Sequence, residues 1–263
     1  MLRMPLHLGL AICLLWLCAA SAAQTPPAPA LPTITLALPD NVPSERMQIQ
    51  YLLIGPFGGY AKYTDPQPGV HSYEIQASKD GKAAIEAMIV AYAPGCKFQT
   101  FDLILFEKTH LERAFACEPL GTVKLSGEII PTKLVQDGKA RVHVSYMAAW
   151  TNHMFGILDG FVSQFEIGSA PVASDGTFEI DLPDFYADTA IPSSPDSASY
   201  WLTLMDADSG DGIADNLEPQ ATDLHMPTGQ LPILPSYPGR LLFAATPVQS
   251  PGSQTGSSAQ MPN

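Results

Sequence analysis

The sequence predicts an all-β protein built from two antiparallel β-sandwich units in tandem. Short segments rich in Val, Ile, Phe and Thr alternate between apolar and polar residues, as half-buried strands do. The 25 prolines and 20 glycines of the 263-residue chain fall largely between these segments. No stretch keeps a helical period over several turns, and many short strands at close spacing are typical of sandwiches.

The first residues predict export from the cytoplasm. "MLRMPLH" carries one arginine, "LGLAICLLWLCAA" is apolar, and "SAAQ" supplies small residues, so residues 1–23 predict a signal peptide cleaved after Ala22 or Ala23. Two alternatives remain open: an uncleaved anchor, and a lipoprotein at Cys18, although Leu17 stands where a small residue is wanted. We expect a secreted, periplasmic or extracellular protein whose mature chain has no membrane span.

The rest of the chain divides by composition. The proline-rich "QTPPAPALP", residues 24–32, predicts an extended spacer. Residues 248–263 have no apolar periodicity and predict a disordered tail. Between them we expect one sandwich over residues 33–120 and a second over residues 121–247, each of Ig-like or transthyretin-like, Greek-key type.

Most strands are visible in the sequence, and three segments are ambiguous. "MQIQYLLI" and "FQTFDLILF" predict strands of the first unit, and "TVKLSGEII", "ARVHVSYMA", "GTFEIDLPDF", "YWLTLM" and "RLLFAA" predict strands of the second. "AAIEAMIVAY" fits a strand or a short helix. "GILDGFVSQF" is compatible with a helical turn, and "GPFGGYAKY" predicts a turn.

Cys96 and Cys117 remain after removal of the signal peptide, because Cys13 and Cys18 lie within it. An even pair of cysteines in an oxidising compartment predicts a disulfide. No C-x-x-C spacing suggests redox chemistry.

The second unit resembles the carboxypeptidase regulatory-like domains of exported bacterial proteins. The resemblance lies in Gly127 within a strand, the Ala140-Val142-Val144 pattern, and the Asp175-Gly176-Phe178 turn. It implies a transthyretin-like sandwich and, through similarity to some starch-binding modules, contact with carbohydrate. The segment between Trp150 and Phe161 is longer than the family pattern.

The negative charge of the chain excludes some classes of binding partner. The formal net charge is −13 and the isoelectric point is about 4.6. Such a chain repels nucleic acid phosphates, and no Lys/Arg cluster offsets this repulsion. We expect a monomer whose partner is a protein or a glycan at the cell envelope, although exposed edge strands could pair.

The stretch "LMDADSGDGIADNLEP" raises the question of a structural calcium ion. Its carboxylates are Asp206, Asp208, Asp211, Asp215 and Glu218. Calcium loops place oxygen ligands at alternate positions on a tightly turning backbone. Here the first two carboxylates are one residue out of step, so an acidic loop between two strands is the competing interpretation. No other cofactor is expected.

Four aromatic residues are candidates for ligand binding: Phe57, Tyr60, Tyr63 and Trp150. Their rings could stack on sugars, or could close the sandwich edges as core. No catalytic residue is predicted, since the sequence has no G-x-S-x-G motif and no paired histidines. We therefore expect a non-enzymatic protein with an accessory binding or structural role. A carbohydrate-binding module and a hydrolase with an unfamiliar site are the alternatives.

Overall fold

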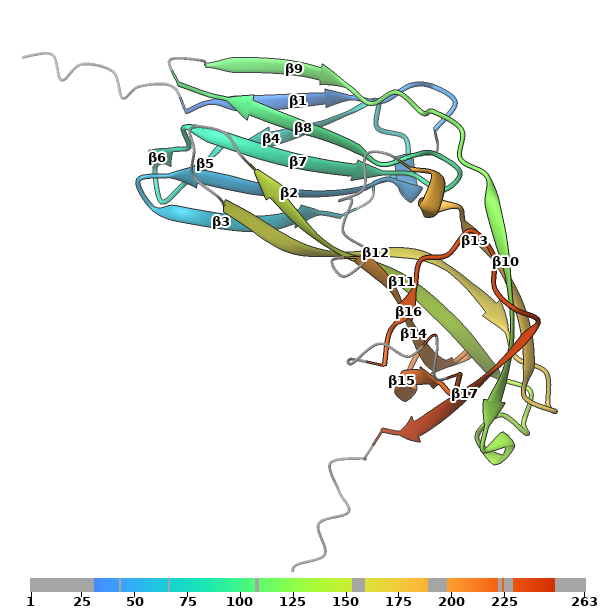
Figure 1. The fold of residues 1–263 in the computed structure, drawn as a ribbon. Coiled ribbons are helices and arrows are strands. Elements are labelled where there is room, and N and C mark those ends of the chain that lie inside the picture. The colour runs from blue at the N-terminus through green and yellow to red at the C-terminus, as the bar shows by residue number, and fades with distance from the viewer. Residues whose placement is uncertain are drawn as a thin grey trace, which may run out of the picture. The chain divides into compact units, whose positions relative to one another are not determined.

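The described part of the protein is almost entirely β-structure, as the sequence predicts. The computed structural model describes residues 31–42, 44–65, 67–106, 109–152, 159–188, 198–221, 224 and 229–248 (Figure 1). These residues belong to one compact unit. The predicted signal peptide, most of the spacer and nearly all of the tail lie outside the described residues. No helix in the described ranges is long and apolar enough to cross a membrane.

The N-terminal half forms two facing sheets and a small hairpin. One sheet has the order β4-β1-β9, the other has the order β3-β2-β7-β8, and β5 pairs with β6. The strands are β1 (Thr33–Ala37), β2 (Gln48–Gly55), β3 (Gly58–Thr64), β4 (Ser72–Gln76), β5 (Ser78–Lys79), β6 (Lys82–Ala83), β7 (Glu86–Tyr92), β8 (Gln99–Ile104) and β9 (His110–Ala114), and a 3-10 turn η1 (Ser44–Arg46) precedes β2.

The C-terminal half is one eight-stranded sheet. Its order is β12-β11-β14-β15-β17-β10-β13, with β16 paired to β14. The end strands β12 and β13 contact each other, so the sheet curls around its own core. The elements are β10 (Thr122–Ile130), η2 (Thr132–Leu134), β11 (Ala140–Asn152), β12 (Asp159–Pro171), β13 (Thr177–Pro183), η4 (Phe185–Ala187), β14 (Ala198–Asp206), β15 (Gly212–Pro219), β16 (Leu231–Pro232) and β17 (Arg240–Pro247).

The ambiguous segment "AAIEAMIVAY" contains strand β7, and its burial explains the ambiguity. Every residue of β7 is buried. Ala87, Ile89 and Ala91 belong to the core between the two N-terminal sheets, whereas Met88 and Val90 belong to the core of the C-terminal sheet. A strand covered on both faces needs no polar alternation, so it resembles a buried helix in sequence.

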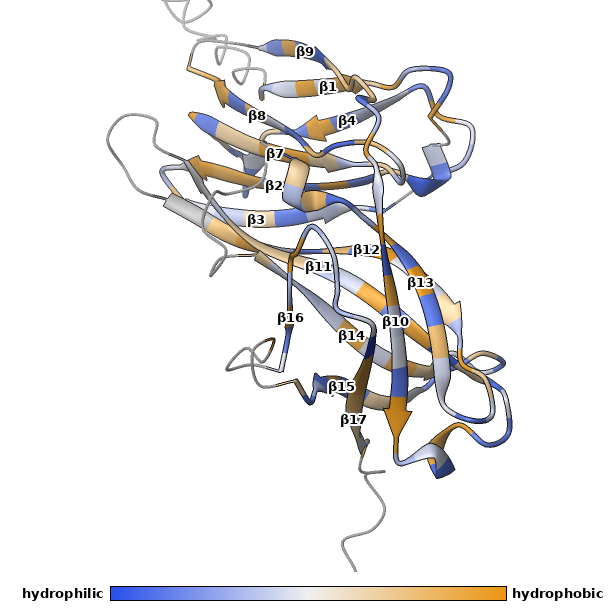
Figure 2. Ribbon diagram, turned by 45° about the vertical axis from the view of Figure 1, so that its right-hand side comes forward, coloured by the Kyte–Doolittle hydropathy of each residue, from blue (hydrophilic) through white to orange (hydrophobic). Residues whose placement is uncertain are grey.

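Other strands alternate as predicted, because only one face is buried. Figure 2 shows this for β10 and β13, whose residues switch between hydrophobic and hydrophilic along each strand. In β13, Phe178, Ile180 and Leu182 face the core. Gly127 of β10 pairs directly with Phe178. A side chain at residue 127 would overlap the Phe178 ring, so glycine is required for this ring to pack.

The sheets are not purely antiparallel, which corrects the prediction. Strand β1 pairs with β9 in parallel, and β10 pairs with β17 in parallel. The partners in each pair lie far apart in the chain, so no hairpin fixes their direction. Two segments also contain strands that the sequence did not reveal. The segment "GPFGGYAKY", for which a turn was predicted, contains a short turn followed by strand β3. The segment "GIADNLEP" is strand β15, in which Ala214 and Leu217 are buried.

The two halves share buried surface and hydrogen bonds. The Gln48 side chain pairs with both backbone groups of Glu166, at 2.6 Å to the carbonyl and 2.7 Å from the N–H. The Gln50 side chain donates to the carbonyl of Gln164. These side-chain amides form hydrogen bonds with backbone groups at the edge of β12, which would otherwise be unpaired. Beside them, Phe98 stacks among aromatic rings of both halves.

The predicted disulfide is confirmed. Cys96 and Cys117 are bonded, 21 residues apart, and Cys96 is buried in the N-terminal core. The bond ties the turn after β7 to the segment that leads into β10, next to the aromatic rings around Phe98. It therefore fixes the point where the chain passes from one half to the other.

Removing this disulfide should destabilise the protein measurably. We expect a Cys96→Ala/Cys117→Ala variant to lose about 3 kcal/mol of unfolding free energy, since closing a loop of this length removes that much chain entropy from the unfolded state. Urea unfolding with and without reductant measures the loss. Reductant should lower the midpoint of the wild-type protein and leave the variant unchanged. Equal midpoints for oxidised wild type and variant would contradict the expectation.

Candidate binding groove

A solvent-open groove of about 570 Å³ lies at one side of the N-terminal sandwich. It is bordered by β3 and β4, which are edge strands of the two facing sheets, and by the β5–β6 hairpin. Its floor is Tyr51 and Leu53 of β2, which are buried in the N-terminal core. Its walls are otherwise polar. The lining residues are Tyr51, Leu53, Tyr60, Lys62, Tyr63, Thr64, Asp65, Gln67, Glu74, Gln76, Ser78, Lys79 and Asp80.

Two of the predicted ligand-binding residues, Tyr60 and Tyr63, line this groove. Residues two apart on a strand share a face, so Tyr60 points to the same side as Lys62, and Tyr63 points to the other side. Tyr60 is half-buried, and the Lys79 ammonium lies 4.3 Å from its ring centre. This cation–π contact fixes both side chains. Tyr63 pairs with Gln50, so its side chain lies on the face opposite to the groove floor, where it is 67 % exposed.

The other two predicted aromatics do not line the groove. Phe57 lies in the turn between β2 and β3 and packs against the N-terminal core. Trp150 is fully buried among the rings around Phe98, and its indole N–H donates to the Ser163 hydroxyl. A ring enclosed in this way has no face to offer a sugar, so Trp150 belongs to the core.

The charges of the groove are nearly balanced. Lys62 and Lys79 contribute two ammonium groups, and Asp65, Glu74 and Asp80 contribute three carboxylates. Among the described residues, neither lysine forms an ion pair, whereas Lys97, Lys124 and Lys139 each pair with an acidic side chain. Lys62 is therefore available to a ligand, whereas Lys79 is held against the Tyr60 ring.

Burial raises the pKa of the Tyr51 hydroxyl, and the neighbouring Tyr60 hydroxyl raises it further. The Tyr51 phenol therefore stays protonated at any physiological pH. At the floor of the groove it can both donate and accept a hydrogen bond.

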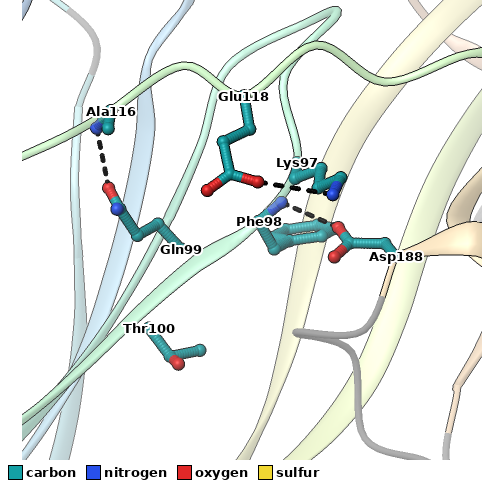
Figure 3. Close-up of a pocket in the computed structure, with 7 residues that line it drawn as sticks. All are labelled: Lys97, Phe98, Gln99, Thr100, Ala116, Glu118 and Asp188. Atoms are coloured by element: carbon teal, nitrogen blue, oxygen red, sulfur yellow. Dashed lines mark hydrogen bonds and ion pairs between the residues drawn. The ribbon is translucent and has the colours of Figure 1, made fainter.

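A smaller pocket of about 270 Å³ lies beside the disulfide (Figure 3). Its polar groups already form hydrogen bonds and an ion pair with one another. The Phe98 N–H donates to the Asp188 carboxylate at 2.9 Å, the Ala116 N–H donates to Gln99, and Lys97 pairs with Glu118. Because these groups secure the passage between the two halves, we assign the pocket a structural role.

The acidic stretch considered for calcium forms a β-hairpin. Asp206 ends β14 and accepts the N–H groups of Asp208 and Ser209, both at 2.9 Å. Asp208 forms an ion pair with Lys139 at 2.6 Å. Asp215 and Glu218 lie on the following strand β15. Asp206 thus stabilises the turn through hydrogen bonds, and Asp208 links the turn to Lys139.

No group of three His, Cys, Asp or Glu side chains in the described ranges is placed to hold a metal ion. Calcium binding by Asp206, Asp208, Asp211, Asp215 and Glu218 stays a prediction. Calorimetric titration with calcium, beside an Asp211→Ala/Asp215→Ala variant, measures it directly.

Asp206 should make the hairpin sensitive to acid. The N–H groups of Ser209 and Asp208 stabilise its charged form and lower the pKa of the carboxyl below the ordinary value of 3.8. The resulting stabilisation is present above that value and is lost as the pH falls through the lowered pKa. The protection of the Ser209 amide against hydrogen exchange, taken relative to the intrinsic exchange rate at each pH, should therefore fall in acid.

Replacing this carboxylate should remove the effect. In an Asp206→Asn variant, we expect the protection factor of the Ser209 amide, followed between about pH 2 and pH 6, to become independent of pH. Asp211→Asn is the matched control, because Asp211 supports the turn through its main-chain carbonyl. An unchanged pH dependence in the Asp206 variant would show that another group controls the turn.

The sequence indicated the two tyrosines but missed the polar walls. Glu74, Gln76 and Ser78 carry no motif, and they reach the groove because β4 and β5 border the same opening as β3. Pairing of β1 with both β4 and β9 places these strands, and such long-range pairing leaves no local signal. The one sequence feature that pointed to the groove was the cluster of Tyr60, Lys62 and Tyr63 after the glycines of the turn.

Comparison with known proteins does not identify a family for this chain. No family model matches the chain, and no curated protein matches it. Among the similar solved structures are two proteins from Bacteroides and a pilin from Lactobacillus rhamnosus. A protein described as an adhesin from Bacteroides thetaiotaomicron has 10% identity, covering 70% of this chain and 79% of its own, with a TM-score of 0.20. A protein described as a cell adhesion protein from Bacteroides uniformis has 13% identity, covering 82% and 93%, with a TM-score of 0.23.

The third is a shaft pilin from Lactobacillus rhamnosus, with 8% identity, covering 83% of this chain and 100% of its own, at a TM-score of 0.20. Likenesses at these TM-scores support no inference about this chain.

Proposed function

We propose that this is an exported, non-enzymatic protein that binds a partner at the cell envelope or outside it. The observation that carries the proposal is the groove beside β3 and β4, where Lys62 shares one face of β3 with Tyr60 and forms no ion pair among the described residues. Groups placed in this way are available to a ligand, whereas the polar groups of the smaller pocket are used internally.

Large pKa shifts belong to tyrosines that are buried in the core. Burial raises the pKa of Tyr92, Tyr146 and Tyr200 well above the usual tyrosine range. These phenols stay protonated and serve the aromatic core. Active sites instead tend to place perturbed groups in a cleft beside a charge partner.

Export is supported by the disulfide, which persists in oxidising compartments, together with the N-terminal sequence. We also propose that the second half is a carboxypeptidase regulatory-like domain. The direct pairing of Gly127 with Phe178 gives two elements of that sequence pattern a shared packing role.

Export is tested by expressing the full chain in a bacterium and measuring the intact mass in each fraction. The proposal expects a chain that begins at Ala23 or Gln24, has no free thiol, and is absent from the cytoplasm. An uncleaved chain with two free thiols in the cytoplasm would overturn export.

Binding is tested with the labelled mature protein on isolated cell envelopes. A Tyr60→Ala/Lys62→Ala variant should lose binding, and a Lys133→Ala/Tyr186→Ala variant should keep it. Lys133 and Tyr186 are exposed residues of the C-terminal half and lie outside the groove. Equal binding by both variants would place the partner elsewhere on the surface.

A further inference from the structure

We infer that the partner of the groove is a protein that adds an extended segment to the free edge of β3 and places a carboxylate opposite Lys62. This inference rests on the proposed binding function and adds the kind of partner and its mode of binding. It follows from three properties of the groove: an unpaired strand edge, an opening that runs along that edge, and one available ammonium group.

The edge of β3 that faces away from β2 has no strand beside it among the described residues (Figure 1). β3 pairs with β2 over all 7 of its residues without a shift in register, and it contains no proline. In an antiparallel pair, alternate residues direct their N–H and C=O groups away from the partner strand. A row of unpaired groups of this kind is a template for a further strand.

The C-terminal half closes its own edges. Its end strands β12 and β13 contact each other. The side chains of Gln48 and Gln50 also donate hydrogen bonds to backbone carbonyls of β12. β3, in contrast, keeps its edge open beside a groove.

The groove follows the strand edges themselves. It is bordered by Tyr63, although that side chain lies on the face of β3 opposite to Tyr60 and Lys62. It is also bordered by Glu74 and Gln76 of β4, which alternate with buried residues of that strand. Residues on opposite faces of one strand meet at its edge, where the backbone lies. The groove therefore presents main chain, with which an extended peptide can pair.

Lys62 gives the added strand a charge preference. Its side chain lies on the groove side of β3 with Tyr60, and it forms no ion pair among the described residues. Lys79, the other lysine of the groove, is held 4.3 Å from the Tyr60 ring centre. A residue directly opposite Lys62 on an added strand would share its face, and opposite charges in such a pair attract. An aspartate or a glutamate therefore fits this position.

A second copy of this chain fits the edge less well. The sequence of β3 is GGYAKYT, so two β3 strands that pair with each other supply no carboxylate. Two copies also repel each other, because each carries a formal net charge of −13. We therefore assign the added segment to a different protein.

The experiment begins with a display library of random heptapeptides, which match the 7 residues of β3, selected on immobilised protein without residues 1–23. We expect the selected peptides to carry an aspartate or a glutamate and no proline at their centre. The best peptide is then titrated by calorimetry into the wild type and three variants.

The variants test the charge. Lys62→Gln should weaken binding about threefold and Lys62→Glu about tenfold, because the first removes the positive charge and the second reverses it. Lys133→Glu is the matched control, since Lys133 is exposed in η2 of the C-terminal half. It should bind as the wild type does. Thermal unfolding of each variant verifies that the substitutions leave the fold intact.

Hydrogen exchange followed by NMR locates the bound peptide. The peptide should slow the exchange of amides on the open edge of β3. The amides of β8, the strand at the other end of the same sheet, should exchange as before. Slowed exchange at β8 with no change at β3 would overturn the assignment to this edge.

Cell envelopes provide a second arm. Because the partner is a protein, treating the envelopes with protease should abolish attachment of the labelled protein. Attachment that survives this treatment would overturn a protein partner.

Other outcomes separate the inference from the proposed function. Failure to select any peptide, together with envelope attachment that depends on Tyr60 and Lys62, would overturn the added strand and preserve the groove as a binding site. Equal affinities of the Lys62→Glu and Lys133→Glu variants would overturn the carboxylate. Slowed exchange of β3 amides in the free protein as its concentration rises would assign the edge to a second copy. No binding to peptides or envelopes would overturn both the inference and the proposed function.

Discussion

Replacing Phe98 by alanine is expected to lower the free energy of unfolding by about 4 kcal/mol, the usual cost of removing a buried phenylalanine ring. Phe98 is 3% exposed and lies in the segment that joins β7 to β8. Its ring centre lies 4.7 Å from that of Tyr92, 4.9 Å from those of Phe165 and Phe185, and 5.0 Å from that of Tyr146.

The effect should be large because this ring belongs to both halves of the protein. Tyr92 comes from the N-terminal sandwich, whereas Tyr146, Phe165 and Phe185 come from the C-terminal half. Removing Phe98 leaves a cavity at their junction, and the surrounding rings can relax only in part.

Urea unfolding followed by tryptophan fluorescence measures this loss, since the Trp150 ring lies 5.5 Å from Phe98. Phe106→Ala is the matched control. Phe106 follows β8 but is 64 % exposed, so its removal should cost less than about 0.5 kcal/mol. Equal losses for the two variants would contradict the shared aromatic core.

Gly127→Ala should cost about 3 kcal/mol, at the upper end of the usual range for overpacking a core. A methyl group at residue 127 would overlap the Phe178 ring and come within 2.9 Å of Phe243. Both rings are buried, and neither can move without displacing its neighbours. The backbone at Gly127 is ordinary extended strand, so the cost arises from crowding alone.

Two comparisons verify this cause. Gly168→Ala, on β12, meets no atom within 4 Å and should leave stability nearly unchanged. Adding Phe178→Leu to the Gly127→Ala variant should recover part of the loss, because a smaller side chain makes room for the methyl group. Additive losses in this double-mutant cycle would show that residues 127 and 178 do not interact.

Strands with one buried face could be predicted from the sequence, and strands in other settings could not. Alternation located β10, β11 and β13, because hydrophobic burial selects every second residue. β7 was ambiguous, since both of its faces are covered. β3 and β15 were missed for the opposite reason, because glycine and exposed polar residues dominate them and mask the period of two.

The same limit applies to the candidate site. Local sequence pointed to Tyr60 and Tyr63, which line the groove, but equally to Phe57 and Trp150, which do not. Burial of Trp150 depends on Phe98, more than fifty positions earlier in the chain, and no local pattern reports such a contact. The disulfide was predictable because Cys96 and Cys117 are the two cysteines outside the predicted signal peptide.

We propose that a partner binds in the groove beside β3 and β4, next to Tyr60. Fluorine NMR tests this binding on a protein without residues 1–23 that is labelled with 3-fluorotyrosine and titrated with solubilised cell-envelope extract. Single tyrosine-to-phenylalanine variants assign the signals of Tyr60 and Tyr186. We predict that the Tyr60 signal shifts with the concentration of the extract while the Tyr186 signal stays fixed. An extract that binds the protein and leaves the Tyr60 signal unmoved would contradict binding in the groove.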